Sequence, residues 1–438
     1  MKQTSPPKSN GLPKGTTTIL AILTLGRSLA WTIENQQFNT FLYNDVSPDP
    51  KAVSAMVAIT AIVSMVTAIM MGTLSDRTVS KWGKRKPYLV LGFILWGFSI
   101  AAFPLAAFFR SASVGVFMAI LFDSIMSFFG ATATDAALPA YVADVTTESN
   151  RGRVLGTMKI MSWLAMLLIY GASGFIIEAY GYLVFFLIIA LVVLLIGLFV
   201  TPHIKEPPST EKPTRSYWRE IADTFSWKSL VKNQSLFLVL ISITMFMIAF
   251  NVFFPFLLIY LEHELQFSIM VSSLMVAVTI LVAGVIIAYP VGLLVDKIGR
   301  RPIAIASVLA LSAGLIAFSF FRSIVPVVLS CIIWLAGYTS WEIATQAWAQ
   351  DLYPEDKRGQ FSGIYILFNV ALTMVPGPLI GGWLADKYGT PAIINGMPGI
   401  IPPALLFQVA AALVLLTFIP LLLAKPKDEK KQSEEPVD

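Results

Sequence analysis

The sequence predicts an all-α membrane protein with twelve transmembrane helices in two pseudo-symmetric bundles of six. Hydrophobic residues make up 56% of the chain and charged residues only 13%, with a mean hydropathy of +0.74. Soluble domains are roughly half apolar and a quarter charged. The apolar runs are about 20 residues long, the length that spans a hydrocarbon core. A charged hairpin also occurs twice, once in each half of the chain, which indicates a duplicated bundle.

The predicted helices are the apolar runs between charged or turn-rich breaks. They span residues 17–42, 51–74, 88–108, 113–144, 153–178 and 181–201, and then 235–261, 268–293, 303–321, 324–351, 360–384 and 402–424. Several are longer than a crossing requires, so we expect tilt or projection beyond the membrane. The chain then divides into an N-terminal bundle (1–201), a linker (202–234), a C-terminal bundle (235–424) and a tail (425–438).

The linker carries a short amphipathic pattern. Trp218, Ile221 and Phe225 recur at helical spacing with charged residues between them. The pattern fits either a helix along the cytoplasmic interface or a partly ordered connection. The tail alternates Lys and Glu without an apolar anchor, which is typical of a disordered segment.

Basic residues gather on one side of the predicted membrane. With the N-terminus inside, the inside segments carry 25 Lys and Arg, whereas the outside segments carry only Lys51, Arg110, Arg322 and Lys387. Because basic residues resist translocation, we expect both termini in the cytoplasm and the protein in the plasma membrane. The net charge of +5 comes from these loops and does not indicate nucleic acid. A single cysteine excludes an internal disulfide, and two histidines argue against a metal site.

The charged hairpin follows the second predicted helix and recurs after the eighth. The first copy occupies residues 72–87 and the second residues 292–302. Their aspartates, Asp76 and Asp296, lie 220 positions apart, half the length of the chain. Both copies lie between long apolar runs, so each connects two helices on the basic side.

Further pairs of residues support the duplication. At a shift of 207 positions, Asp135, Asp144, Arg151 and Gly152 coincide with Glu342, Asp351, Arg358 and Gly359. At a shift of 208, Gly174, Glu178, Tyr180 and Gly181 coincide with Gly382, Asp386, Tyr388 and Gly389. Internal repeats of this kind are how transporters place a central site between two halves.

The repeated signature Gly-x-Leu-x-Asp-Arg … Gly-(Lys/Arg)-Arg resembles that of the major facilitator superfamily, over residues 16–424. Within this superfamily, residues 75–87 are most similar to the glycoside–pentoside–hexuronide symporters and the related sucrose carriers. The resemblance implies alternating-access transport of a small polar solute such as a sugar or glycoside. The second helix lacks the acidic residues of the sodium-coupled melibiose type, so we expect coupling to a proton rather than to sodium.

The resemblance also implies a cytoplasmic gate, in which each hairpin pairs with the acidic ends of helices 4 and 10. Arginines can bind carboxylates through two hydrogen bonds, and an aspartate gains from a nearby helix N-terminus. We expect Gly72 and Gly292 to allow close helix approach, and Gly83 and Gly299 to form tight turns. Alternatively, the basic residues only determine topology. The predicted gate comprises Gly72, Asp76, Arg77, Gly83, Arg85, Asp144, Arg151, Gly292, Asp296, Gly299, Arg300, Asp351 and Arg358.

Six ionisable residues lie within predicted helices, where each is a functional candidate by default: Arg27, Glu34, Asp123, Asp135, Lys159 and Glu342. Arg27, Trp31 and Glu34 share one helix face. Arg27 lies roughly 15 Å along the first helix, near the midplane. The resemblance implies that helices 1, 4, 7 and 10 line a central cavity. These side chains therefore either contact a polar solute there or form an ion pair that only stabilises packing.

The carboxylates of the two halves differ in their expected partners. Asp135 and Lys159 lie at similar depths, so they can pair, either structurally or as a switch. The repeat places Glu342 at the position of Asp135 but Ile366 at that of Lys159. A buried carboxylate without a cation can carry a proton at neutral pH, which makes Glu342 the leading proton-coupling candidate. Asp123 lies nearer the outer side, about 120° around the helix from Asp135. Hydroxyl-binding candidates are Asn251, Trp341, Gln346 and Asn369.

Other function classes lack their motifs in this sequence. It has no phosphate-binding Gly-rich loop, no His-rich metal spacing and no Gly-x-Ser-x-Gly elbow, which argues against an enzyme or an ATP-driven pump. Channels usually build pores from several subunits, whereas this chain closes its own pseudo-symmetry. We expect a monomer in the lipid bilayer, without cofactor, that binds a small molecule and a proton. The alternatives are a drug or organic-anion efflux antiporter and an uncoupled facilitator.

Overall fold

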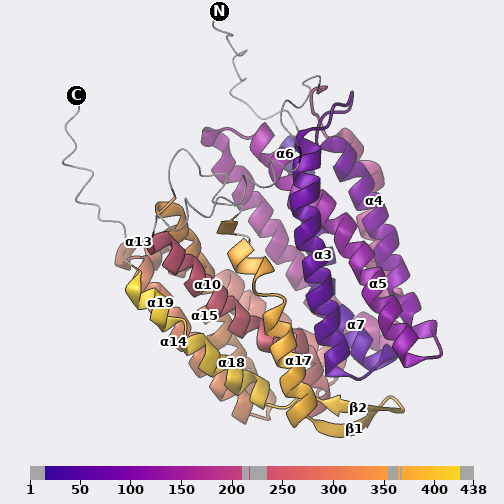
Figure 1. The fold of residues 1–438 in the computed structure, drawn as a ribbon, viewed down its shortest axis with the longest axis vertical. Coiled ribbons are helices and arrows are strands. Elements are labelled where there is room, and N and C mark those ends of the chain that lie inside the picture. Colours follow the sequence, from indigo (N-terminus) through magenta and orange to yellow (C-terminus); the bar gives the residue numbers. More distant parts are fainter. Residues whose placement is uncertain (1–14, 210–216, 218–233, 354–363, 366, 425–438) are drawn as a thin grey trace, which may run out of the picture.

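The helices form two groups that lie side by side, shown from indigo to magenta and from orange to yellow in Figure 1. The computed structural model describes residues 15–209, 217, 234–353, 364–365 and 367–424. The first half contains α1 (Thr16–Asn35), α2 (Gln37–Phe41), α3 (Pro50–Asp76), α4 (Lys86–Ala102), α5 (Ala112–Ala131), α6 (Leu138–Val145) and α7 (Glu148–Leu195). The second half contains α10 (Gln234–Phe253), α11 (Leu257–Ile259), α12 (Ile269–Thr279), α13 (Ala288–Ile298), α14 (Arg300–Phe320), α15 (Ile324–Asp351), α17 (Pro376–Tyr388), α18 (Leu405–Leu415) and α19 (Phe418–Leu423).

These elements account for the twelve predicted spans. Ten helices within the described residues are long and apolar enough to cross a membrane. One of them, Asn150–His203, contains two predicted spans, because Gly181 takes a positive φ of 80° and breaks α7 there. The predicted helix 360–384 lies partly outside the described residues and continues as α17. Three other predicted features also lie outside the described residues: the amphipathic linker pattern that begins at Trp218, the gate candidate Arg358, and the tail.

The helix surfaces fit a hydrocarbon environment. Large apolar side chains point outward, for example Leu91 at 58% exposed, Phe117 at 63% and Ile160 at 63%. Inside the first half, the ring of Phe38 stacks on that of Phe103 with their centroids 3.6 Å apart. Apolar residues on both faces are typical of helices surrounded by lipid on one side and packed on the other.

Several helices are interrupted by short wide turns of π-helical form. One of these, η3 (Thr132–Ala137), lies between α5 and α6 and contains Asp135. Others are η1 (Leu42–Val46), η4 (Ile196–Val200), η7 (Tyr260–Glu264), η8 (Ile280–Ile286) and η10 (Leu367–Ala371). Turns of the 3₁₀ form are η2 (Phe103–Phe108), η5 (Thr201–His203) and η6 (Phe254–Phe256). Because π-helical bulges often mark functional sites, η3 singles out the segment around Asp135.

A β-hairpin follows α17, where the sequence analysis predicts no strand. Strand β1 (Thr390–Ile394) pairs antiparallel with β2 (Met397–Ile401), with Thr390 opposite Ile401. The turn residues Asn395 and Gly396 both have positive φ, at 50° and 80°. An Asn-Gly pair between two apolar segments is a strong sequence signal for such a hairpin.

The two halves approach most closely near this hairpin, where α3 packs against α17 and α7 against α12. A Cβ on Gly174 would collide with the backbone of Met270, and one on Gly382 with the side chain of Ser54. These two glycines are related by the sequence repeat. We call this side of the molecule the hairpin end, and the opposite side, where α6 and α13 lie in Figure 1, the basic end.

Gly72 and Gly292 do not have the predicted role of allowing close helix approach in this conformation. A Cβ on Gly72 or Gly292 would meet nothing within 4 Å, so neither glycine permits a close helix contact. The tight turns are confirmed, because Gly83 and Gly299 have positive φ of 96° and 102°. A different repeat-related pair, Gly174 and Gly382, stands where the two halves approach each other closely.

Candidate functional site

Arg27 and Asp135 form an ion pair between α1 and η3. The guanidinium Nη2 donates to Asp135 Oδ1 at 3.2 Å, and the two side chains are 39% and 28% exposed. Ser64 of α3 and Thr134 also donate hydrogen bonds to this carboxylate. Asp135 is thus connected to two other helices of the first half, and its cation partner is Arg27.

Asp135 does not form an ion pair with Lys159, the cation at similar depth with which the sequence allowed it to pair. The Lys159 ammonium instead lies 5.3 Å from the ring centroid of Trp163, as a cation–π contact within α7. Trp31, one turn after Arg27 on α1, donates its indole N–H to Thr134 Oγ1 at 2.9 Å. Arg27 and Trp31 therefore both reach the same short segment, Thr134 and Asp135.

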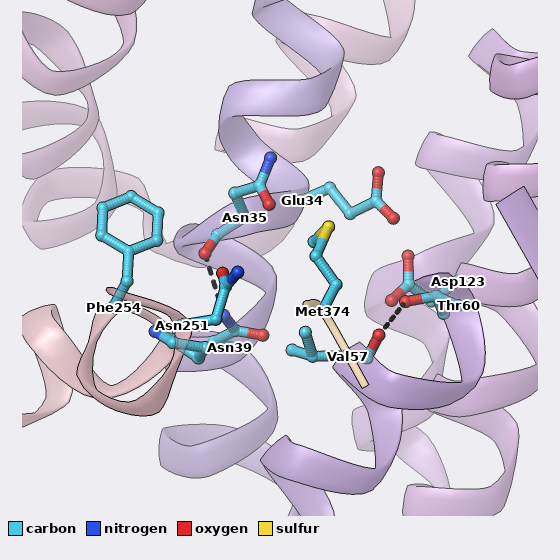
Figure 2. Close-up of a pocket in the computed structure, with 10 residues that line it drawn as sticks. Glu34, Asn35, Asn39, Val57, Thr60, Asp123, Asn251, Phe254 and Met374 are labelled. Carbon is cyan, nitrogen blue, oxygen red and sulfur yellow. Dashed lines mark hydrogen bonds between the residues drawn. The ribbon is translucent and has the colours of Figure 1, made fainter. Parts of the chain in front are cut away.

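Glu34 and Asp123 line a pocket at the contact between the two halves (Figure 2). Ser127 Oγ donates to Glu34 Oε1 at 2.8 Å. Asp123 lies one turn before Ser127 on α5 and is only 1% exposed. Glu34 shares a helix face with Arg27, but Arg27 binds Asp135 and not Glu34.

The candidates of the second half occupy different environments. Trp341 is buried and stacks on Phe246 with ring centroids 4.3 Å apart, so it is a packing residue in this conformation. Glu342 hydrogen-bonds the hydroxyl of Tyr338, one turn earlier on α15, and it takes part in no ion pair with the described residues. The remaining candidates are Gln346, which is exposed; Asn369, which is partly buried; and Asn251, which donates to Met247 O and Thr373 Oγ1.

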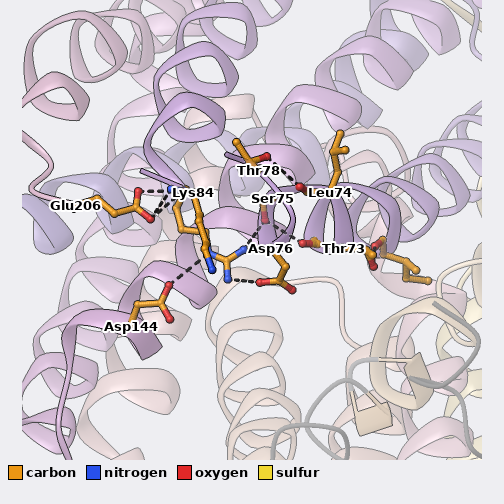
Figure 3. A network of polar contacts seen from close by, with 11 residues as sticks. Thr73, Leu74, Ser75, Asp76, Thr78, Lys84, Asp144 and Glu206 are labelled. Atoms are coloured by element: carbon orange, nitrogen blue, oxygen red, sulfur yellow. Dashed lines mark hydrogen bonds and ion pairs between the residues drawn. The ribbon is translucent and has the colours of Figure 1, made fainter. Parts of the chain in front are cut away.

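Arg85 is the centre of the polar cluster at the basic end of the first half (Figure 3). Its side chain is 8% exposed and forms an ion pair with Asp76. It also lies 3.4 Å from Asp144 Oδ2, through Nε, and donates to Ser75 Oγ at 2.6 Å. The pairing of the hairpin with the acidic end of the fourth predicted helix is therefore present within one half.

Glu206 is a partner of this cluster that the sequence analysis missed. Its carboxylate accepts hydrogen bonds from the backbone N–H groups of Lys84, Arg85 and Lys86, at the N-terminus of α4. A carboxylate at a helix N-terminus satisfies donors that lack a partner in the helix. A Cβ on Gly83 would collide with the Glu206 side chain, so glycine serves both the turn and this contact.

The second half carries a related cluster with a shifted arginine. Arg300 Nε donates to Asp351 Oδ2 at 3.0 Å, and its Nη1 lies 3.9 Å from Asp296. The repeat aligns Arg300 with Lys84 through the turn glycines, yet Arg300 binds the equivalents of the carboxylates that Arg85 binds. The other gate candidates lie at the periphery, since Arg77 stacks over Tyr217 and Arg151 donates to Thr146 Oγ1.

Asn44 connects the two halves at the hairpin end. Its side-chain N–H₂ donates to Glu262 Oε2 at 3.1 Å, and its Oδ1 lies 2.7 Å from His263 Nε2. Its backbone oxygen accepts from Asn395 Nδ2 at 3.0 Å. The neighbouring Tyr43 donates its hydroxyl hydrogen to Ile400 O at 2.6 Å. None of these residues was among the functional candidates predicted from the sequence.

Two further contacts at this end follow the sequence repeat. Glu178 of the first half accepts a hydrogen bond from Met270 N, in the first turn of α12, at 2.8 Å. Its repeat partner Asp386 of the second half pairs with Lys51, in the first turn of α3, at 2.7 Å. Each half therefore extends one carboxylate to the start of a helix in the other half. The sequence repeat already aligns Glu178 with Asp386, so it could have pointed to these contacts.

We expect the Lys51–Asp386 pair to contribute little stability, because its side chains are 58% and 30% exposed. A double-mutant cycle of Lys51→Met and Asp386→Asn is expected to show nearly additive effects of the two substitutions on stability. Thermal unfolding of the purified single and double variants measures them. Clearly non-additive effects would show that the pair is desolvated by the contact between the halves.

The polar contacts at the two ends differ in kind. Among the described residues, the hydrogen bonds and ion pairs that join the two halves lie toward the hairpin end. The arginine clusters at the basic end each stay within one half. The described structure is thus tied together by polar contacts on the hairpin side of the pocket.

Comparisons with known proteins agree with this architecture. Residues 19–376 match the family model described as Major Facilitator Superfamily. No curated protein matches the chain. Among solved structures, the nucleoside transporter NupG is 14% identical, with a TM-score of 0.71 over 94% of this chain and 99% of that chain. A D-xylose–proton symporter is 15% identical, with a TM-score of 0.71 over 94% and 98%. At these identities the likeness shows the fold alone.

Proposed function

We propose, because the chain belongs to the Major Facilitator Superfamily, that it moves a small polar solute across the membrane by alternating access. The chain is a multi-pass membrane transporter and not an enzyme. The observation that carries the proposal is the set of polar contacts between the halves, which among the described residues lie toward the hairpin end. A carrier that alternates needs two sets of contacts, one for each end, of which only one is closed at a time.

The sidedness follows from the distribution of basic residues. The 25 Lys and Arg of the inside segments support a cytoplasmic basic end and a hairpin end on the outside. In that orientation the contacts of Asn44, Tyr43 and the Lys51–Asp386 pair lie on the outer side, which supports an inward-facing state. The clusters of Arg85 and Arg300 would then meet across the halves in the opposite, outward-facing state.

The residues near the centre support a hydroxyl-bearing or otherwise polar solute. Arg27, Asp135 and the indole of Trp31 offer hydrogen bonds and an aromatic face in one place. Two proteins of similar fold are described as transporters of a nucleoside and of D-xylose, which are both polyhydroxylated. The second candidate is efflux of an amphipathic drug or organic anion, for which Arg27 would be the anion-binding group.

Counterflow tests the transport proposal directly. Purified protein in liposomes loaded with an unlabelled sugar or nucleoside is expected to accumulate the labelled form transiently when that compound is a substrate. A thermal-shift screen of sugars, glycosides, nucleosides and organic acids would first select the compounds. Transport that follows its gradient without transient accumulation would indicate a channel and contradict alternating access.

Coupling to protons is proposed to involve Glu342. Its partner is the neutral Tyr338 hydroxyl, whereas its repeat counterpart Asp135 is bound by Arg27. A carboxylate without a cation in a helix interior can gain and lose a proton during the cycle. Glu342→Gln is therefore expected to abolish proton-driven accumulation but retain counterflow, and Glu342→Asp should keep part of both. Undiminished proton-driven uptake in Glu342→Gln would remove Glu342 from the coupling mechanism.

A further inference from the structure

The pocket in Figure 2 is lined by six polar and four apolar residues and is too small for an organic solute. Its volume is about 20 Å³, enough for one particle the size of a water molecule. The polar residues around it are Glu34, Asn35, Asn39, Thr60, Asp123 and Asn251. They come from α1, α2, α3, α5 and α10, so both halves contribute to the lining.

Two carboxylates meet at this pocket. The hydrogen bond from Ser127 brings Glu34 to α5, within one helical turn of Asp123. Because both carboxylates line the same small pocket, their negative charges repel each other. Neither carboxylate forms an ion pair with a described residue, and Arg27, two turns before Glu34 on α1, is bound to Asp135. Two like charges in a buried place therefore lack a compensating cation among the described side chains.

Three buried oxygens at the pocket accept no hydrogen bond from the described residues: Glu34 Oε2, Asp123 Oδ1 and Asn39 Oδ1. Asn39 is only 1% exposed, and its amide nitrogen donates to Asn35 O at 2.9 Å. The amide oxygen of Asn39 points to the side of the pocket where Asp123 and Thr60 lie (Figure 2). Because Asn39 is neutral and lies on a different helix, it is an observation independent of the acidic pair.

We propose that Glu34, Asp123 and Asn39 bind a small monovalent metal cation, sodium or lithium, in this pocket. Hard cations prefer carboxylate and amide oxygens as ligands. A Ca²⁺ ion takes six to eight such oxygens, more than this pocket leaves without partners. An alkylammonium group exceeds the volume. The site uses α1, α2 and α5, whereas the expectation of a proton rather than sodium rests on the second predicted helix alone.

Cation binding links the two halves, since Asn251 and Phe254 of the second half complete the lining. A cation that binds only while the pocket is assembled would stabilise the conformation described by the structure. Its role as a coupling ion rests on the proposed transport function. The binding itself does not, and it is measured without any transported solute.

Thermal unfolding of the purified protein tests the site. Titration with NaCl or LiCl, at constant ionic strength against choline chloride, is expected to raise the melting temperature saturably by roughly 1–3 °C. Asp123→Asn and Glu34→Gln are each expected to weaken the apparent sodium affinity at least tenfold. The matched control is Asp45→Asn, an exposed aspartate in η1, which should respond as the wild type does.

Equilibrium binding of radioactive sodium to the wild type gives a second readout that needs no variant, with one ion per chain expected. Equal melting temperatures in sodium and choline, together with no bound sodium, would overturn the proposal. So would a sodium response that survives in both Asp123→Asn and Glu34→Gln. Stabilisation by acid alone would assign the carboxylates to a proton instead, and a response confined to Ca²⁺ would exclude a monovalent ion. Counterflow is measured separately, so its failure would leave these results interpretable.

Discussion

Arg85→Ala is expected to lower the free energy of unfolding by roughly 2–3 kcal/mol and to remove most transport activity. Arg85 is the one buried group that joins Asp76, Asp144 and Ser75 within the described part of the basic end. Its removal leaves two acidic side chains close together without their cation. These carboxylates are 61% and 53% exposed, so water screens part of their repulsion and the main loss is that of the charged hydrogen bonds.

Thermal unfolding of purified variants and uptake into cells together check this expectation. Arg85→Lys keeps the charge but cannot bind three partners with its single ammonium, so an intermediate effect is expected. The matched control is Arg300→Ala in the second half, whose side chain is 33% exposed and should matter less for stability. Equal melting temperatures for Arg85→Ala and wild type would show that the cluster only marks the cytoplasmic side, which is the topology alternative.

The clusters at the basic end could be predicted because each is encoded by a short stretch of sequence that occurs in both halves. Each combines a short turn around a positive-φ glycine with an aspartate that precedes its arginine, by nine residues in the first half and by four in the second. The aligned acidic ends, Asp144 and Asp351, then supplied the partners. The shift from Arg85 to Arg300 was not predictable, because which of two adjacent side chains faces the neighbouring helix depends on where that helix begins.

The partner of Asp135 could not be predicted, because sequence spacing does not fix the direction in which a side chain points around its helix. Lys159 matches it in depth, but depth along the membrane normal leaves the direction around each helix open. The π-helical turn η3 widens the helix at Asp135 and changes the direction of the residues around it. Arg27 of α1 reaches this turn, whereas Lys159 remains over Trp163 on its own helix.

The contacts of Asn44 were not predictable for a related reason. They join residues more than 200 positions apart and exist only once the two halves are placed against each other. By contrast, Glu178 and Asp386 were already aligned by the repeat, and both contact the opposite half. Symmetry therefore makes inter-half contacts predictable from the sequence, but only those that occur twice.

Arg27→Gln is expected to reduce uptake at least tenfold, which corresponds to about 1.4 kcal/mol of lost interaction free energy. Arg27 and Trp31 lie on one face of α1 and both contact η3, where Arg27 binds Asp135 and Trp31 binds Thr134. Removing one member of a paired couple leaves the other charge uncompensated. Because the side chains are 39% and 28% exposed, we expect a stability loss of only about 1–2 kcal/mol.

The double variant Arg27→Gln with Asp135→Asn distinguishes a role of this ion pair in transport from a role in helix packing alone. Both side chains are then neutral and keep similar shape, so the uncompensated charge disappears and thermal stability should return close to the wild-type value. If the pair contacts the solute or changes during the cycle, uptake stays low in the double variant. Recovery of both stability and uptake would instead show that the ion pair only holds α1 against η3. The solute would then have to be bound by other residues, and the indole of Trp31 is the next to replace.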